Sequence, residues 1–319
     1  MMLYPFLQLF LSTLFISTVI AISSHHWVVI WLALELNMIS FIPLIASSNW
    51  HQEHEAGLKY LIFQALGSSL LLLFSFNLAA TGLLIIALTI KLGAAPFHFW
   101  FPSVMKSSSW SAAAILMTWQ KIAPVSLMLS FFSQAPLLSL VGMLSAGVGG
   151  VGGMNQTHIR SLLAYSSIGH MGWIIAGAAF SPSAAIIYFF VYVLMSLAVV
   201  GTSLLSNVSL IKSTFSPKSN AHHKLLIPAM ISLGGLPPFT GFIPKLLLLM
   251  SMNTLFIPLL LIASSLLNLI YYLNFIFTAF LSTNQLKAPA HINYPFFMSA
   301  SLWLATSPLP MVFMLTLLI

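Results

Sequence analysis

Charged residues are too scarce in this sequence to build a surface that faces water. Asp, Glu, Lys and Arg make up 4% of the 319 residues, whereas hydrophobic residues make up 60%. Soluble domains carry about 25% charged residues. The main solvent of the folded chain is therefore predicted to be lipid.

Apolar stretches long enough to cross a bilayer recur along the whole chain. A spanning helix needs about 20 predominantly apolar residues. The sequence therefore predicts an all-α integral membrane protein with about eleven transmembrane helices in a single transmembrane domain, residues 1–319. The polar stretch 207–224 is expected to be a loop. The helices are expected at 3–22, 27–48, 58–77, 82–104, 110–131, 136–154, 160–180, 184–206, 225–250, 255–281 and 296–318.

Cations in the loops and at the very ends of these helices all lie on the side that follows an even-numbered helix, and the loops after odd-numbered helices carry none. Because successive helices alternate in direction, these cations share one membrane face with the N-terminus, and the C-terminus lies on the opposite face. The positive-inside rule assigns the cationic face to the matrix or the cytoplasm. The cations are Lys59, Lys106, Arg160, Lys212, Lys218, Lys224 and Lys287.

Sequence features of redox and nucleotide sites are missing. The chain has no cysteine, so it offers no thiolate for an iron–sulfur cluster. The dinucleotide, P-loop and zinc-protease motifs do not occur. Cations are scattered singly, which argues against nucleic acid, and isolated histidine pairs make poor metal sites. Any redox or nucleotide chemistry is therefore expected in other chains.

Four acidic or basic residues other than histidine remain well inside the predicted helices, away from their ends: Glu35, Lys91, Lys121 and Lys245. A charge at the bilayer centre costs from about 2.5 to more than 10 kcal/mol, so such residues normally face a protein interior or a water cavity. Glu35 and Lys91 are expected at similar depth on helices that run in the same direction, so an ion pair between them is geometrically possible. The alternative is a structural salt bridge that only fixes helix packing.

Lys121 and Lys245 have no acidic partner of their own in the membrane. The sequence has no Asp, and its other acids, Glu53 and Glu55, are expected in a loop. Desolvation penalises a charged lysine that lacks a partner, which suits such a lysine to gaining and losing a proton. The alternative is a snorkelling lysine, which fits Lys121 badly because it lies in mid-span.

Two predicted helices carry residues that break helices. The helix at 82–104 contains Gly93, Pro96 and Pro102, and the helix at 225–250 contains several glycines and prolines around Gly235. Each also bears one of the membrane lysines. The two helices are five apart and run in opposite directions, which predicts inverted five-helix repeats with two broken helices, as in many ion transporters.

Two histidines lie within the predicted helices. His98 follows Lys91 by seven residues, which would place both on one face of a continuous helix, and His170 lies within the seventh helix. Histidine relays protons near neutral pH. The alternative for each is a hydrogen-bonded packing residue.

Six motifs occur in an order that resembles a known family. The similarity runs over residues 27–250, and the helix count extends it. The sequence resembles the chain 2 family of NADH–ubiquinone oxidoreductase. Members of this family form one of the antiporter-like membrane subunits of mitochondrial complex I. The motifs are WLALELN, EAGLKYLIFQALGS, KLGAAPFHFW, TWQKIAPVSL, NQTHIRSLLAYSSIGHMGW and GLPPFTGFIPK.

The resemblance implies a role in proton translocation for each membrane charge. Glu35 would tune the charge of Lys91, the first lysine of the path. Lys121 would link the two half-channels, and Lys245 would lie nearest the proton exit. These assignments rest on the matching motifs.

The resemblance also implies positions for the two histidines, with His98 and His170 along a hydrated axis between the lysines. One position departs from the family, because Ser103 stands where a glutamate usually follows the proline of HFWxP. That difference puts a general role for this loop carboxylate in doubt and leaves the lysine positions unaffected.

Further implications concern partners and location. The family is part of respiratory complex I, so NADH, FMN, iron–sulfur clusters and ubiquinone are expected in other subunits. Neighbouring antiporter-like subunits and lipids such as cardiolipin are expected partners, with no nucleic acid. The resemblance implies that the chain lies in the mitochondrial inner membrane, with its N-terminus in the matrix and its C-terminus in the intermembrane space. It also implies a short form that lacks three N-terminal helices.

Two alternative functions are considered. The chain could be a stand-alone cation/proton antiporter, or a scaffold in which the charges only hold the helices together.

Overall fold

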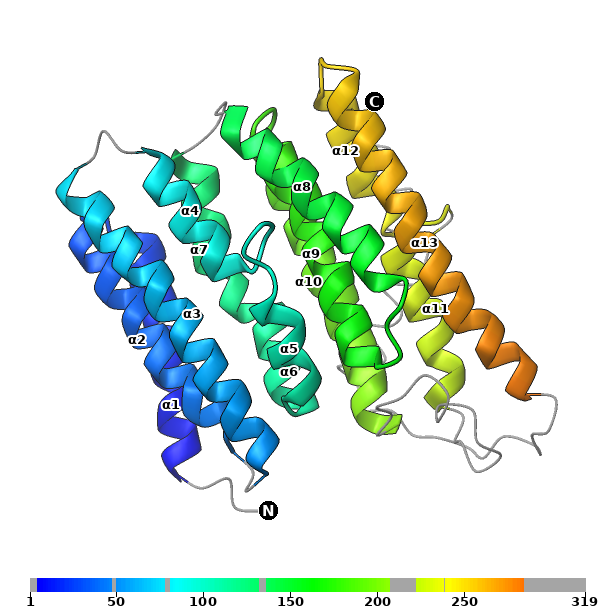
Figure 1. Cartoon of the computed structure of the whole chain (residues 1–319), viewed down its shortest axis with the longest axis horizontal. Helices are drawn as coiled ribbons and strands as arrows, with labels where there is room; N and C mark the ends of the chain where they lie inside the picture. Colours follow the sequence, from blue (N-terminus) through cyan, green and yellow to red (C-terminus); the bar gives the residue numbers. More distant parts are fainter. Residues whose placement is uncertain are drawn as a thin grey trace.

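The structure is a computed structural model that describes residues 5–47, 50–77, 81–131, 136–206, 222–237 and 239–283 of the chain. Figure 1 shows its helices side by side with broadly aligned axes, from α1–α3 at one edge to α11–α13 at the other. The helices are α1 (Pro5–Ser23), α2 (Trp27–Ile45), α3 (His51–Phe76), α4 (Thr81–Leu92), α5 (Trp100–Ser107), α6 (Trp110–Met117), α7 (Trp119–Phe131), α8 (Pro136–Gly153), α9 (Ile159–Ala178), α10 (Pro182–Ser206), α11 (His222–Gly234), α12 (Phe242–Ser251) and α13 (Phe256–Thr283).

Ten of the predicted transmembrane stretches coincide with these helices. The remaining stretch, 296–318, lies outside the described residues, as does most of the predicted loop at 207–224. Within the described ranges, seven helical stretches are long and apolar enough to cross a membrane by themselves. The prediction of an all-helical membrane protein is confirmed at this level.

The start of α3 differs from the prediction. Glu53 and Glu55 were expected in a loop, but α3 begins at His51 and includes both. Acidic side chains are favourable in the first turn of a helix. Glu55 also forms a 2.6 Å ion pair with Lys59 one turn later, which supports the extra helical turns.

Both helices predicted to be broken are interrupted in the structure. The stretch 82–104 consists of α4 and α5, and the stretch 225–250 consists of α11 and α12. Gly93 and Gly235 begin the two breaks with φ of +66° and +73°, a left-handed conformation that glycine adopts readily. A further break at Thr118, which the sequence did not indicate, separates α6 from α7, and the Thr118 hydroxyl donates to the Ala114 carbonyl.

Buried apolar side chains form two clusters at different depths along the same helices. In α9, residues from Ile159 to Ile168 belong to one cluster and residues from Met171 to Ala178 to the other; α2 and α3 are divided in the same way. Because the helices are aligned (Figure 1), the boundary between the clusters is a layer near mid-helix. We call the buried polar residues at this boundary the polar layer: Asn37, Gln64, Ser68, Lys91, Lys121, Ser166, Ser167, His170, Ser232, Lys245, Ser264 and Asn268.

Backbone contact between α8 and α9 positions part of this layer. A Cβ atom on Gly149 would lie 2.4 Å from the Gly169 nitrogen, and one on Gly172 would lie 2.4 Å from the Ala146 nitrogen. Small residues allow this close approach between membrane helices. The contact fixes α9, which carries Ser166, Ser167 and His170.

Candidate functional site

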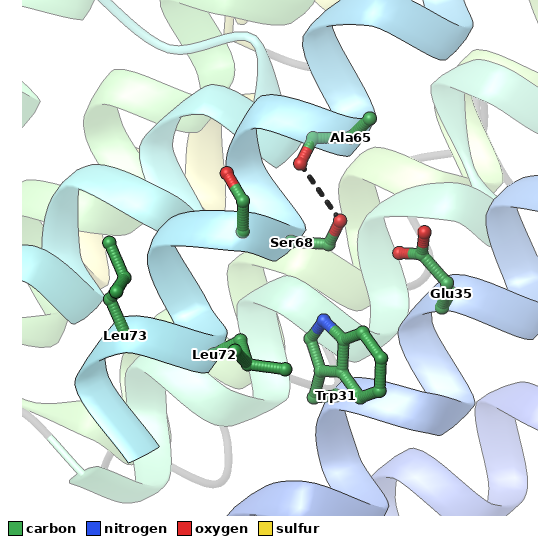
Figure 2. Close-up of a pocket in the computed structure, with 7 residues that line it drawn as sticks. Trp31, Glu35, Ala65, Ser68, Leu72 and Leu73 are labelled. Carbon is green, nitrogen blue, oxygen red and sulfur yellow. Dashed lines mark hydrogen bonds between the residues drawn. The ribbon is translucent and has the colours of Figure 1, made fainter. Parts of the chain in front are cut away.

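Glu35 lies on α2 and lines a pocket between α2 and α3. The pocket has a volume of about 390 Å³, and Trp31, Ala65 and Ser68 are among its lining residues. Figure 2 shows Glu35 and Trp31 projecting from α2 toward Ser68 on α3. Glu35 Oε2 and Trp31 Nε1 are buried and have no hydrogen-bond partner among the described residues. The carboxylate therefore faces the pocket.

Lys91 lies in the last turn of α4 and is 6% exposed. The geometrically possible ion pair with Glu35 does not form in the described part of the chain. The reason is that Glu35 points into the α2–α3 pocket, although its charge still acts on Lys91 through space. The carboxyl-terminal end of α4 also favours a cation at this position.

Packing and hydrogen bonds fix the turn of α4 that carries Lys91. A Cβ atom on Gly67 would lie 3.0 Å from Lys91 Cγ, so α3 leaves only enough space for the lysine stem. Where the helix ends, Gln64 Nε2 donates to the Lys91 carbonyl at 3.2 Å, and Trp100 Nε1 donates to the Ile90 carbonyl at 3.1 Å. Gln64 thus provides a donor for a carbonyl at the end of the helix, and Trp100 adds a second donor to the Ile90 carbonyl, which also accepts from the Gly93 N–H at 3.1 Å.

His98 does not share a helix face with Lys91, so that part of the prediction is wrong. The helix ends at Leu92, and Gly93 turns the chain before His98 is reached. The His98 Nδ1 atom lies 3.2 Å from the Pro96 carbonyl oxygen, and its ring lies 6.5 Å from that of Tyr165. The structure therefore places His98 within the break between α4 and α5.

Lys121 lies on α7, deep in the polar layer, and is 2% exposed. Its ammonium donates to the Ser167 hydroxyl of α9. The ring centroids of Phe101 and Tyr192 lie 4.6 Å and 5.6 Å from Lys121 Nζ. Aromatic faces stabilise a cation in this position, so α5, α9 and α10 all contribute to holding the ammonium.

Lys245 lies on α12 and reaches back across the second break. Its Nζ donates to the Gly234 carbonyl at 2.9 Å, at the end of α11, and lies 5.9 Å from the Trp173 ring centroid. The ammonium therefore binds one of the carbonyls that α11 leaves without a helical partner. Lys91 in α4 and the ammonium of Lys245 at α11 thus each lie at the carboxyl-terminal end of an interrupted helix.

His170 is 2% exposed and lies on α9 between Ser167, which contacts Lys121, and Trp173, which contacts Lys245. Its Nδ1 lies 2.9 Å from the Tyr188 hydroxyl, and its ring lies 5.3 Å from that of Tyr192. Both Lys245 and Lys121 are close enough to act on the imidazole through space. The structure therefore brings Lys121, His170 and Lys245 together around one buried centre.

Several polar residues of this centre were not singled out in the sequence. Ser167 precedes His170 by three residues, and Tyr188 and Tyr192 are four apart on α10, so each pair lies on one helix face. Polar side chains at helical spacing inside apolar spans were the available signal. The positions of these side chains against Lys121 depend on tertiary packing.

A hydrogen-bonded link connects the first three helices to the neighbourhood of Lys121. Gln120 Nε2 donates to Asn37 Oδ1 at 2.8 Å, and the Tyr60 hydroxyl donates to Gln120 Oε1 at 3.2 Å. The link joins α2, α3 and α7. It connects Asn37, on the same helix as Glu35, to Gln120, which directly precedes Lys121.

Comparison with known proteins bears on this arrangement. A family profile described as "NADH:quinone oxidoreductase/Mrp antiporter, TM" matches residues 24–78 and 73–271. NADH-ubiquinone oxidoreductase chain 2 of Lumbricus terrestris is 43% identical over 291 residues, which is 86% of this chain and 87% of the relative. The Canis rufus protein of the same name is 38% identical over 309 residues, 89% of each chain. The chain belongs to the NADH-ubiquinone oxidoreductase chain 2 family.

Solved structures share the fold of this chain 2 family member. A chain of respiratory complex I from Thermus thermophilus matches with a TM-score of 0.77 and 24% identity, over 93% of this chain and 75% of that chain. A chain of the Mrp complex from Dietzia sp. DQ12-45-1b matches with a TM-score of 0.74 and 18% identity, over 88% and 60% of the two chains. At these identities the likeness shows the fold alone.

Proposed function

We propose that the polar layer is the path along which this antiporter-like membrane subunit of respiratory complex I moves protons. Lys91, Lys121 and Lys245 carry the proton in that order, and Glu35 adjusts the charge of Lys91. His170 relays the proton between Lys121 and Lys245. The observation that carries the proposal is that the buried His170 lies on α9 between Ser167, which contacts Lys121, and Trp173, which contacts Lys245.

Buried lysines without acidic partners are suited to carrying protons. Lys121 is held by a hydroxyl and by aromatic faces, and Lys245 is held by a backbone carbonyl. None of these groups is charged, so each lysine can lose its proton without leaving an unpaired carboxylate. A carboxylate close to Lys121 or Lys245 would instead stabilise the ammonium and slow proton release.

Energy for the transfer comes from reactions in other subunits. NADH, FMN, iron–sulfur clusters and ubiquinone belong to those subunits, and neighbouring antiporter-like subunits and lipids such as cardiolipin cover the outer faces of this one. A change at Glu35 reaches Lys91 through space, because the two are coupled but not paired. Protonation or movement of Glu35 therefore alters the proton affinity of the first lysine. His98, in the break between α4 and α5, is kept as a further relay candidate.

The broken helices and the cationic face support the expected topology. The two breaks, five spans apart, correspond to inverted five-helix repeats in an eleven-helix transmembrane domain that comprises residues 1–319. At one end of the bundle, Arg160 donates to the Ser108 carbonyl and lies near Glu53. Burial, and then the charges of Lys106 and Arg160, lower the pKa of His158 at the same end.

This cationic end is assigned to the mitochondrial matrix by the positive-inside rule, which places the C-terminus in the intermembrane space. Lys212, Lys218 and Lys287, which were predicted on the same face, lie outside the described residues.

A substitution at Lys121 tests the proposed path. Lys121→Ala is compared with Lys106→Ala, which removes an exposed lysine at the end of α5. With the complex fully assembled, we expect Lys121→Ala to lower the number of protons moved per NADH and Lys106→Ala to leave it unchanged. Undiminished proton translocation in the Lys121 variant would exclude the path.

Two further observations address the alternative functions. Co-migration of the chain with a large NADH-oxidising assembly on a native gel supports complex I, whereas free migration supports a stand-alone antiporter. A scaffold role would be supported if variants of the membrane lysines impair assembly of the complex, and if no variant that assembles has lowered proton translocation.

A further inference from the structure

The two ring nitrogens of His170 differ in their hydrogen bonding. Nδ1 lies 2.9 Å from the Tyr188 hydroxyl, whereas Nε2 is buried without a hydrogen-bond partner among the described residues. The Leu233 backbone lies close to the ring but forms no hydrogen bond with Nε2. Leu233 precedes Gly234, whose carbonyl binds Lys245. The imidazole therefore lies beside the break that holds Lys245.

Tyr188 is itself held rigidly. Its side chain is fully buried on α10, and its ring stacks on Trp173 with a centroid distance of 6.4 Å and an interplanar angle of 15°. The ring of Trp173 also faces the ammonium of Lys245. The hydroxyl that meets His170 is therefore fixed by the same packing that surrounds Lys245.

A neutral imidazole carries its single ring proton on either nitrogen, and the hydrogen bond at one nitrogen decides which. A tyrosine hydroxyl oxygen can accept from Nδ1–H when the ring is neutral and when it is an imidazolium. In that arrangement Nε2 has a free lone pair in the neutral form. The ring can then gain and lose a proton without any rearrangement at Nδ1.

We propose that Tyr188 is a positioning residue for His170: its hydroxyl oxygen accepts from Nδ1–H, so Nε2 exchanges the translocated proton. The inference rests on the proposed relay role of His170. In the first step the Lys121 ammonium loses a proton, through water, to Nε2, which leaves a neutral amine and an imidazolium. In the second step Nε2 returns that proton to a neutral Lys245 amine, and the ring is again neutral with its proton on Nδ1.

The titratable groups around His170 and Tyr188 come from four neighbouring helices. Lys121 on α7 and Lys245 on α12 act on His170 directly, and Tyr192 on α10 lies against its ring. Tyr272 on α13 acts on Tyr188. A change in the pH dependence of translocation on loss of the Tyr188 hydroxyl therefore has to be separated from effects on these groups.

The test uses Tyr188→Phe in assembled complex I, with Tyr271→Phe as the matched control. Tyr271 is a buried tyrosine on α13 that packs against Gly153, so the control also removes one buried hydroxyl. We expect Tyr188→Phe to lower proton translocation by about tenfold and to change its pH profile, because the ring proton is no longer confined to Nδ1. We expect Tyr271→Phe to behave as the wild type. An unchanged rate and pH profile in Tyr188→Phe would overturn the inference.

A double variant separates positioning from packing. If Tyr188 acts through His170, Tyr188→Phe has no further effect on translocation in a His170→Asn background. Equal losses in both backgrounds would mean a structural role and would overturn the inference. A loss in His170→Asn combined with a neutral Tyr188→Phe would overturn only this inference, whereas full translocation in His170→Asn would also remove the proposed relay.

If the Tyr188→Phe variant does not assemble, the inference can be tested by determining the tautomer of His170 in the wild-type complex. Infrared difference spectra of complexes with ¹⁵N-labelled histidine, compared between wild type and His170→Asn, distinguish the two neutral tautomers. We expect the His170 signal of an imidazole protonated at Nδ1. A signal from the tautomer protonated at Nε2 would overturn the inference.

Discussion

The ammonium of Lys245 donates to the Gly234 carbonyl at 2.9 Å, across the break between α11 and α12. A lysine of the proposed proton path is therefore also the donor that satisfies the end of an interrupted helix. Loss of its proton leaves a neutral amine, whose attraction to the helix end is weaker. The charge of Lys245 and the geometry of the break are coupled in this way.

That coupling predicts different outcomes for two substitutions at Lys245. Lys245→Met leaves the Gly234 carbonyl without its donor, which is expected to cost about 1.5–3 kcal/mol. Lys245→Arg keeps a cationic donor that does not release its proton. We expect the methionine variant to lower the melting temperature of the complex and both variants to lose proton translocation. Translocation at the wild-type rate in Lys245→Arg would contradict the role of Lys245 as a carrier.

The contact between Gly67 and Lys91 predicts the effect of one added methyl group. In Gly67→Ala the new Cβ would lie 3.0 Å from Lys91 Cγ and 3.2 Å from the Ala87 carbonyl oxygen, so the lysine stem has to shift. We expect assembled complex with proton translocation lowered by about tenfold. Gly82→Ala in α4 is the control, because nothing lies within 4 Å of its added Cβ. Equal translocation rates in the two variants would show that the position of Lys91 is not critical.

The contact between α8 and α9 predicts a loss of stability. In Gly149→Ala the added Cβ would lie 2.4 Å from the Gly169 nitrogen, which is backbone and cannot move aside alone. Overpacking of this kind costs about 1–3 kcal/mol or more. We expect less assembled complex on native gels. Gly147→Ala in the same helix has open space around its Cβ and is expected to assemble normally; equal assembly of both variants would show that the helices can separate at no cost.

Much of the fold follows from the length of apolar stretches. Ten predicted stretches coincide with helices because about 20 apolar residues are stable in a bilayer only with internal backbone hydrogen bonds. The breaks at Gly93 and Gly235 were predictable for a local reason, since glycine and proline act on their own turn. The break at Thr118 was not, because threonine occurs in many uninterrupted helices. The helical start of α3 was missed because Glu53 and Glu55 are polar, although polar residues suit a helix end.

The burial of the membrane lysines was predictable, but their contacts were not. Lys91, Lys121 and Lys245 were singled out as candidates because charge in an apolar span is costly. Lys121 contacts Ser167 and Lys245 contacts the Gly234 carbonyl. Both partners belong to other helices, so the sequence around each lysine does not indicate them. His98 was placed on a continuous helix that the structure interrupts.

The polar layer predicts ordered water. Gaps between Lys121, His170 and Lys245 have to be bridged for a proton to pass, and buried polar groups hold water when two to four partners are present. We expect a high-resolution map of the complex to show water molecules between Lys91, Lys121 and Lys245. A dry gap lined by apolar side chains along this route in every state of the complex would argue against it.

Proton release from Lys121, as distinct from its charge, is tested most directly by Lys121→Arg. Arginine keeps the cation in the polar layer but stays protonated. With Lys106→Arg as the control, the measurement is the number of protons moved per NADH oxidised by assembled complex in vesicles. We expect this ratio to fall in Lys121→Arg and to stay at the wild-type value in Lys106→Arg. A wild-type ratio in Lys121→Arg would contradict proton transfer through this lysine.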